Sequence, residues 1–162
     1  MINMELTTDE LFGHVTNQAL IEILGWSSNV TYLAPAPATY FYGAIAQNAK
    51  EDENITIPSN SILIDNISIK SVEQLNYRLL FWNDDAYGDF IGYVDLDLVQ
   101  YGFQIGGAGV WYLNVSNVLL PYVDTDESEE MHVSLMCLSA AGKSAGAAGL
   151  VTLQLGYRVR DI

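Results

Sequence analysis

The second half of the chain alternates apolar and polar residues over short segments, which acidic or glycine-rich turns separate. Segments such as LNYRLLFW (75–82) and MHVSLMCLS (131–139) place an apolar side chain at every second position. A period of two is the pattern of a β-strand with one face on a hydrophobic core. The stretches between them, such as DTDESEE, are too polar to join that core. The sequence therefore predicts a series of strands.

The same reading extends to the first half of the chain. Turn signals recur every 8–12 residues or so, and no alternation of strands with helices interrupts them, which favours an antiparallel sandwich. About eight strands fit a jelly roll. We predict an all-β fold, an antiparallel jelly-roll-like β-sandwich with an N-terminal arm or short helix. Strands are expected near 18–24, 39–46, 61–70, 75–82, 90–99, 109–115, 131–139 and 150–158.

The segment SILIDNISIK (61–70) changes phase in its middle. Ile62 and Ile64 share one face of a regular strand, whereas Ile67 and Ile69 fall on the other face. A β-bulge inserts one extra residue and reverses the phase. A bulge near Asp65-Asn66 would therefore bring all four isoleucines to one buried face.

The chain divides into an arm and one domain. Residues 1–17 are predicted to form an arm or short helix, because Thr7 and Glu10 fit a capping box. Residues 18–162 form a single β-sandwich domain, in which 47–60 is a polar connection with a short strand at 55–57. Cys137 continues the apolar phase of its strand and is expected to be buried. The expected core includes Leu79, Phe81, Leu96, Leu98, Val133, Leu135, Leu153 and Leu155.

Charge and hydropathy limit the possible partners. The formal net charge is −14, from 20 acidic and 6 basic residues without a basic cluster, so nucleic acid and anionic membranes are poor partners. The N-terminus lacks the features of a secretory signal, and no apolar run is long enough to span a bilayer. A soluble protein made in the cytoplasm is expected.

Two small-residue motifs resemble nucleotide-binding loops only in part. Gly142-Lys143-Ser144 matches the end of a P-loop, but Cys137 stands where that motif requires glycine. Gly106-Gly107-Ala108-Gly109 lacks the dinucleotide-binding spacing. Both are interpreted as turns between strands, and no cofactor is expected.

Two acidic clusters could hold a hard cation such as Ca²⁺ if their loops folded into a cage. Neither has the register of a calcium-binding loop, so solvated acidic loops are the favoured interpretation. The calcium alternative rests on Asp84, Asp85, Asp89, Asp124, Asp126 and Glu127.

Catalytic residue types are scarce. Asp95 and Asp97 lie two apart on one strand and could in principle form an acid/base pair. His14 and His132 have no metal-binding spacing, and His132 has the phase opposite to Met131 and Val133, so it is expected to face outward. A Ser-His-Asp arrangement is not indicated. An enzyme is therefore not expected.

Motifs between Ser61 and Tyr157 resemble a family. SILIDNISIK, LNYRLLFWNDDAYGD, FIGYVDLDL, LLPY and MHVSLMCLSAAGKSAGAAGLVTLQLGY follow one another in this order. The chain is similar in this respect to the β-sandwich decoration (cement) proteins of tailed bacteriophages. The resemblance implies a structural virion protein that binds the outer surface of the capsid and reinforces contacts between capsomers. The viral major capsid protein and other copies of the chain, as a dimer or trimer, would be its partners.

Surplus aromatic residues suit such an interface, and adjacent aromatics on one strand point to opposite faces. A carbohydrate- or receptor-binding module would use the same side chains for stacking, and a small jelly-roll enzyme is a third possibility. The contact residues expected are Leu11, Phe12, Trp26, Tyr32, Tyr40, Tyr42 and Trp111.

Overall fold

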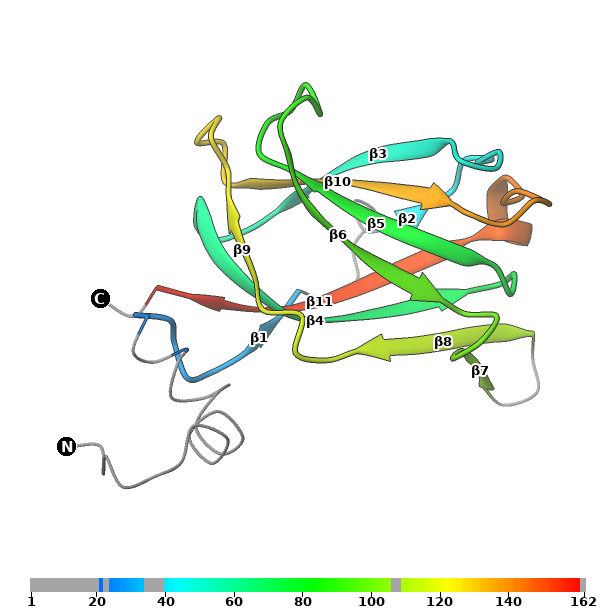
Figure 1. The fold of residues 1–162 in the computed structure, drawn as a ribbon, viewed down its shortest axis with the longest axis horizontal. Coiled ribbons are helices and arrows are strands. Elements are labelled where there is room, and N and C mark those ends of the chain that lie inside the picture. Colours follow the sequence, from blue (N-terminus) through cyan, green and yellow to red (C-terminus); the bar gives the residue numbers. More distant parts are fainter. Residues whose placement is uncertain (1–20, 22–23, 34–39, 106–108, 161–162) are drawn as a thin grey trace, which may run out of the picture.

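The computed structural model of the chain describes residues 21, 24–33, 40–105 and 109–160. Two antiparallel sheets face each other and form a sandwich (Figure 1). The predicted all-β class and sandwich arrangement are therefore confirmed, while the jelly-roll connectivity stays a prediction. The arm predicted over 1–17 lies outside the described residues. In the described part of the chain, no helix has the length and apolar character needed to cross a membrane.

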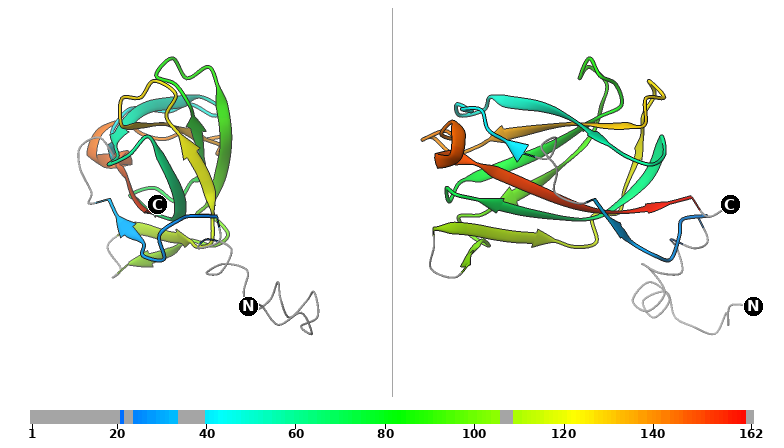
Figure 2. Two further views of the ribbon diagram at one scale, coloured as in Figure 1. Left: turned by 90° about the vertical axis from the view of Figure 1, so that its left-hand side faces the viewer. Right: turned by 180° about the vertical axis from the view of Figure 1, so that it is seen from behind.

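The larger sheet is built around two long central strands, β4 and β11. β11 pairs with β4 on one side and with β1 and β2 on the other, while β4 also pairs with β9 and β8, and β8 with β7. The other sheet has the order β3-β10-β5-β6. Figure 2 shows the sandwich from two further directions. The strands are β1 (Thr31–Tyr32), β2 (Tyr40–Phe41), β3 (Lys50–Thr56), β4 (Ser61–Ser71), β5 (Asn76–Trp82), β6 (Phe90–Asp97), β7 (Phe103–Ile105), β8 (Val110–Val115), β9 (Leu120–Val123), β10 (Glu130–Cys137) and β11 (Val151–Val159).

The hydrophobic core lies between the sheets and matches the predicted core. All eight core residues named from the sequence are buried, with at most 1% of their surface exposed. Cys137 is also buried. Alternation along each strand therefore identified the inward face correctly.

The predicted bulge in β4 is confirmed. Gly156 pairs with Asn66 and Tyr157 pairs with Ile64, so Asp65 is the extra residue. Ile62, Ile64, Ile67 and Ile69 consequently all point into the core, each fully buried. The Asn66 side chain lies over Gly156, where an added Cβ would approach its amide nitrogen to 2.5 Å.

Several predicted boundaries were wrong. Ile21 is helical and Leu24-Gly25 form a turn, so the described residues of 18–24 do not form a strand, and the strand over 39–46 is reduced to β2. The polar connection over 47–60 contains β3, which pairs with β10 along seven residues. β3 has one buried apolar residue, Ile55, and charged side chains suit an edge strand. Its alternation was therefore too weak to detect.

Candidate functional site

The outer face of the four-stranded sheet, which points away from the other sheet, carries the most organised polar and aromatic side chains. Cross-strand pairing places residues of four strands side by side on this face. One row contains Asn54, His132, Trp82 and Phe90, and the next contains Asp52, Ser134, Leu80 and Tyr93. The Trp82 indole N–H donates to Ser134 Oγ over 2.9 Å.

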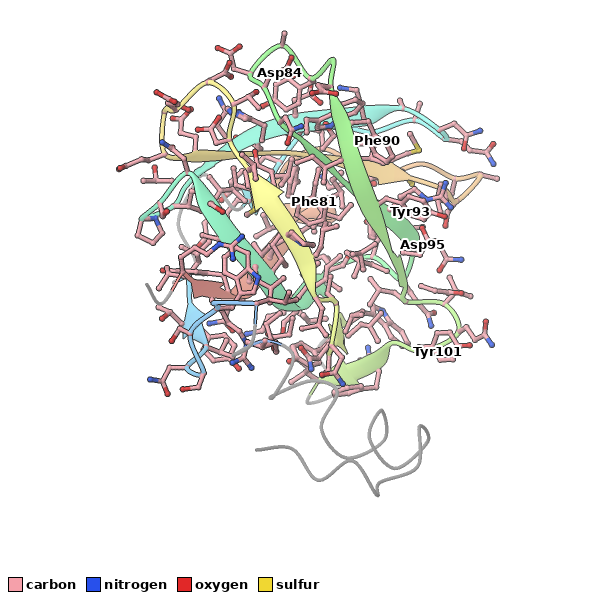
Figure 3. The ribbon with its side chains drawn as sticks, turned by 60° about the vertical axis from the view of Figure 1, so that its left-hand side comes forward. Phe81, Asp84, Phe90, Tyr93, Asp95 and Tyr101 are labelled. Atoms are coloured by element: carbon pink, nitrogen blue, oxygen red, sulfur yellow. The ribbon has the colours of Figure 1, made fainter. Side chains whose placement is uncertain are left out.

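Aromatic rings continue along β6 at the open edge of this sheet. Phe90 contacts the Trp82 ring edge-on, with 5.4 Å between centroids, and stacks on Tyr93 at 6.5 Å. Arg78 lies over Tyr93, 4.3 Å from the ring centroid, and binds Asp95 through two hydrogen bonds of 2.6 and 3.1 Å. Phe90, Tyr93 and Asp95 follow one another along β6 in Figure 3.

Apolar side chains remain exposed where this edge approaches the edge of the larger sheet. β6 and β7 are edge strands of their sheets, and the chain between them runs along the same side of the sandwich (Figure 3). Phe90 and Tyr93 are about half exposed, and Tyr101 is 64% exposed. We call this surface the apolar flank. Its members are Phe90, Tyr93, Val99 and Tyr101.

A buried carboxylate organises the loop between β9 and β10. Asp124 is 2% exposed, and its oxygens accept hydrogen bonds from the Asp126 and Ser128 backbone, the Ser128 hydroxyl and the Glu130 backbone. Burial alone would raise the pKa of Asp124, but the hydrogen bonds from Ser128, Glu130, His132 and Asp126 together lower it below the usual value. Its interpretation as part of a solvated acidic loop was therefore wrong.

His132 faces Asp124 from β10. Its Nε2 lies 3.2 Å from Asp124 Oδ1 and 3.6 Å from Asp126 Oδ2, and its Nδ1 lies 2.9 Å from Asn54 Oδ1. The Tyr87 ring contacts the imidazole edge-on at 6.1 Å. His132 does occupy the outer face, as its phase predicted, but it is fully buried because these loops cover it. The strand phase therefore predicted its face but not its burial.

The Tyr122 hydroxyl connects the two sheets beside this cluster. Tyr122, on β9, accepts a hydrogen bond from the His132 backbone N–H at 2.8 Å and donates one to the Trp82 carbonyl at 2.7 Å. Burial raises its pKa far above the usual value. This hydroxyl therefore fixes β9 against β5 and β10.

The remaining calcium candidates make bonds within or between the two loops. Asp84 Oδ1 accepts from the backbone of Gly88 and Asp89, and the Asp85 backbone N–H donates to Asp126 Oδ2 over 2.6 Å. The two acidic clusters, treated separately in the sequence, thus meet in space. Glu127 is exposed, and among the described residues it does not belong to the cluster of Asp124, Asp126 and His132.

The predicted contact aromatics are spread over the larger sheet and its ends. Tyr32 and Tyr42 are at least half exposed, and Tyr40 contacts Tyr42 edge-on at 6.0 Å. Trp26 is only 5% exposed, so it is part of a small buried cluster and not of the free surface. Trp111 is partly buried. Leu11 and Phe12 lie outside the described residues.

The Asp95/Asp97 pair and Lys143, which the sequence analysis singled out, form hydrogen bonds within the fold. Asp95 is bound by Arg78, and Asp97 Oδ1 accepts from the Gln100 backbone N–H, so each carboxylate has a partner of its own. Lys143, in the loop interpreted as a turn between strands, is buried and donates to the Gly43 and Ser144 carbonyls. Burial lowers its pKa, and no alternation in the sequence marked this residue.

A shallow groove lies on the outer face of the larger sheet. It is lined mainly by polar residues around Tyr112. The Tyr112 hydroxyl donates to Ser68 Oγ over 3.2 Å. Its lining residues are Ser68, Lys70, Tyr112, Thr152, Leu153 and Gln154.

Comparison with known proteins gives a weak likeness of fold. No family model matches the chain, and no curated protein matches it. Among solved structures it is similar to the crystal structure of the infectious bursal disease virus VP2 subviral particle, with 14% identity and a TM-score of 0.39. The match covers 82% of this chain and 33% of that one, so the chain spans about a third of its length. The likeness is to the β fold of a viral capsid protein and assigns neither a family nor a function.

Proposed function

We propose that the protein is a structural virion protein that binds the outer surface of a tailed-phage capsid and reinforces contacts between capsomers. The motifs between Ser61 and Tyr157, with their resemblance to capsid decoration proteins, support this proposal. Under it, the protein acts on the capsid exterior as a dimer or trimer, through surface complementarity and without catalysis or a cofactor. Icosahedral symmetry would repeat each contact and turn modest affinity into avidity.

The observation that carries the proposal is the apolar flank. Clustered exposed apolar groups on a soluble domain mark interaction surfaces, and aromatic residues are enriched in interface cores. Tyr93 and Tyr101 are 53% and 64% exposed, and no other described strand pairs with the outer edge of β6 or β7. A capsid protein that covered the flank would bury these rings without changing the fold.

Charge indicates what should surround that contact. The chain carries a net charge of −14, and the loop that leads into Phe90 contains Asp84 (Figure 3), Asp85 and Asp89. Complementary charge across an interface accelerates association and suppresses wrong partners. We therefore expect basic residues on the capsid around the apolar contact, and binding that slows as salt is added.

Occupancy on capsids tests the proposal. Capsids purified from the phage grown without this protein would be mixed with wild-type protein, with Tyr93→Ser/Tyr101→Ser, or with the control Tyr32→Ser/Tyr42→Ser, and bound copies counted by quantitative mass spectrometry. The flank variant should lose at least tenfold in affinity, and the control should bind like wild type. If the Tyr32/Tyr42 variant loses affinity and the Tyr93/Tyr101 variant does not, the capsid contact lies on Tyr32 and Tyr42. Wild-type protein that never binds capsids would refute the proposed function.

A second candidate function, binding of a carbohydrate receptor, is favoured by the groove around Tyr112. Hydroxyl, amide and ammonium groups from Ser68, Gln154 and Lys70 border its ring, which could stack on a sugar. A glycan array probed with wild-type protein and Tyr112→Ala separates the two functions. Specific glycan binding that Tyr112→Ala abolishes, without any binding to capsids, would favour this alternative.

A further inference from the structure

We propose that Asp124, Asp126 and His132 form a binding site for a divalent transition-metal cation of the Zn²⁺ class, which ties the loop 124–130 to β10. This inference is independent of the proposed function. The three residues offer one imidazole nitrogen and two carboxylate groups, and their ligand atoms all lie within 4.8 Å of one another.

The spacing of the donor atoms fits a small cation. Zn²⁺ binds histidine nitrogen and carboxylate oxygen at about 2.0–2.2 Å, so two ligands of a tetrahedral ion are about 3.3–3.6 Å apart. His132 Nε2 is 3.2 Å from Asp124 Oδ1 and 3.6 Å from Asp126 Oδ2. One ion placed between these atoms would need only small side-chain adjustments.

Hydrogen bonding outside the cluster indicates that a positive charge belongs there. Asn54 Oδ1 accepts a hydrogen bond from the Tyr87 hydroxyl and also faces His132 Nδ1 at 2.9 Å. This network assigns the proton of a neutral imidazole to Nδ1, because Asn54 Oδ1 has no proton to give. Nε2 of the neutral ring then has no proton for Asp124 Oδ1, which lies 3.2 Å away. The contact between these two atoms therefore needs either a second proton on the ring or a cation in the place of that proton.

His132 makes a hydrogen bond through its second ring nitrogen, as metal-bound histidines do. Such a histidine usually donates its second N–H to a carbonyl or carboxylate, which fixes the ring and its tautomer. Asn54 provides a side-chain carbonyl from the neighbouring strand β3. His132 and Asp124 are fully buried at their side chains, whereas that of Asp126 is 34% exposed and leaves a route from solvent.

The donor set decides the class of metal. Calcium takes six to eight oxygen ligands, and an imidazole nitrogen suits transition metals instead. The surroundings are acidic, since Glu130 and Asp85 lie beside the cluster and donate backbone hydrogen bonds to Asp124 and Asp126. A divalent cation is therefore favoured by both its ligands and the local field, and the calcium alternative considered from the sequence gives way to a Zn²⁺-class ion.

Calorimetric titration of EDTA-treated, full-length protein with ZnCl₂ tests the site. We expect one Zn²⁺ per chain and no comparable heat with CaCl₂. Asp126→Asn keeps an acceptor for the Asp85 N–H but removes one ligand charge, so it should weaken Zn²⁺ binding at least tenfold. Asp85→Asn removes the same charge from an exposed neighbour outside the cluster and should change the affinity less than threefold.

Nitrogen NMR of the histidine rings provides a second readout that does not depend on folding of a variant. The Nε2 resonance of His132 should move on addition of Zn²⁺, while that of His14 should not, which excludes the other histidine as the ligand. The proposal is overturned if wild-type protein binds no Zn²⁺, if Asp126→Asn binds like wild type, or if Asp85→Asn loses as much affinity as Asp126→Asn. It is equally overturned if both His132 nitrogens remain protonated in the presence of Zn²⁺, because the occupant is then a proton.

Discussion

Removal of the Tyr122 hydroxyl should destabilise the sandwich without creating a cavity. Tyr122→Phe keeps the buried ring, but it leaves the His132 N–H and the Trp82 carbonyl without the hydroxyl that now bonds both. A buried polar group without its partner costs about 1–3 kcal/mol, so the loss of partners for both groups should reduce the free energy of unfolding by about 2–6 kcal/mol. The melting temperature should fall by at least about 4 °C, since a domain of this size loses ~2–4 °C per kcal/mol.

Urea unfolding followed by tryptophan fluorescence measures this loss directly. Tyr157→Phe is the matched control, because Tyr157 is also buried and its hydroxyl has no hydrogen-bond partner among the residues that the structure describes. We expect the control to lose less than about 1 kcal/mol and the slope of free energy against urea to be unchanged in both variants. If Tyr122→Phe is no less stable than Tyr157→Phe, the hydroxyl does not connect the sheets as argued.

Three further predictions follow from burial, ionisation and the chain terminus. Leu135→Ala should cost about 2–5 kcal/mol in urea unfolding because the side chain is fully buried, and a loss below ~0.5 kcal/mol would contradict its inward phase. The raised pKa values of buried Tyr77 and Tyr122 stabilise the fold fully below pH 10, the usual tyrosine pKa, and this stability is lost as pH rises above it. Unfolding free energies measured from pH 8 upward should therefore fall less steeply in Tyr122→Phe, and equal slopes would refute this contribution. Deletion of residues 1–15 should leave the circular dichroism spectrum unchanged but abolish capsid attachment, and unchanged occupancy would show that the arm is not the anchor.

The sequence by itself was sufficient for the strands of the core. Alternation determines which side chains share a face, because successive residues of a strand point to opposite sides. Val133 and Leu135 could therefore be assigned to the core, and the phase change in β4 could be assigned to a bulge before its pairing was known. Weakly alternating strands such as β3 escaped detection because they form through pairing with a neighbour, β10, that is distant in sequence.

Only the tertiary structure shows which loops cover the outward-facing side chains of a strand. His132 has the phase of an exposed residue, yet it is buried because the loops around Tyr87 and Asp124 fold over the same end of the sheet. Lys143 is buried in a loop that its small neighbours made appear open. Alternation describes one strand and its two faces, whereas burial of a polar group depends on partners contributed by several distant segments. For this reason the core was predictable from local pattern, and the cluster of Asp124, Asp126 and His132 was not.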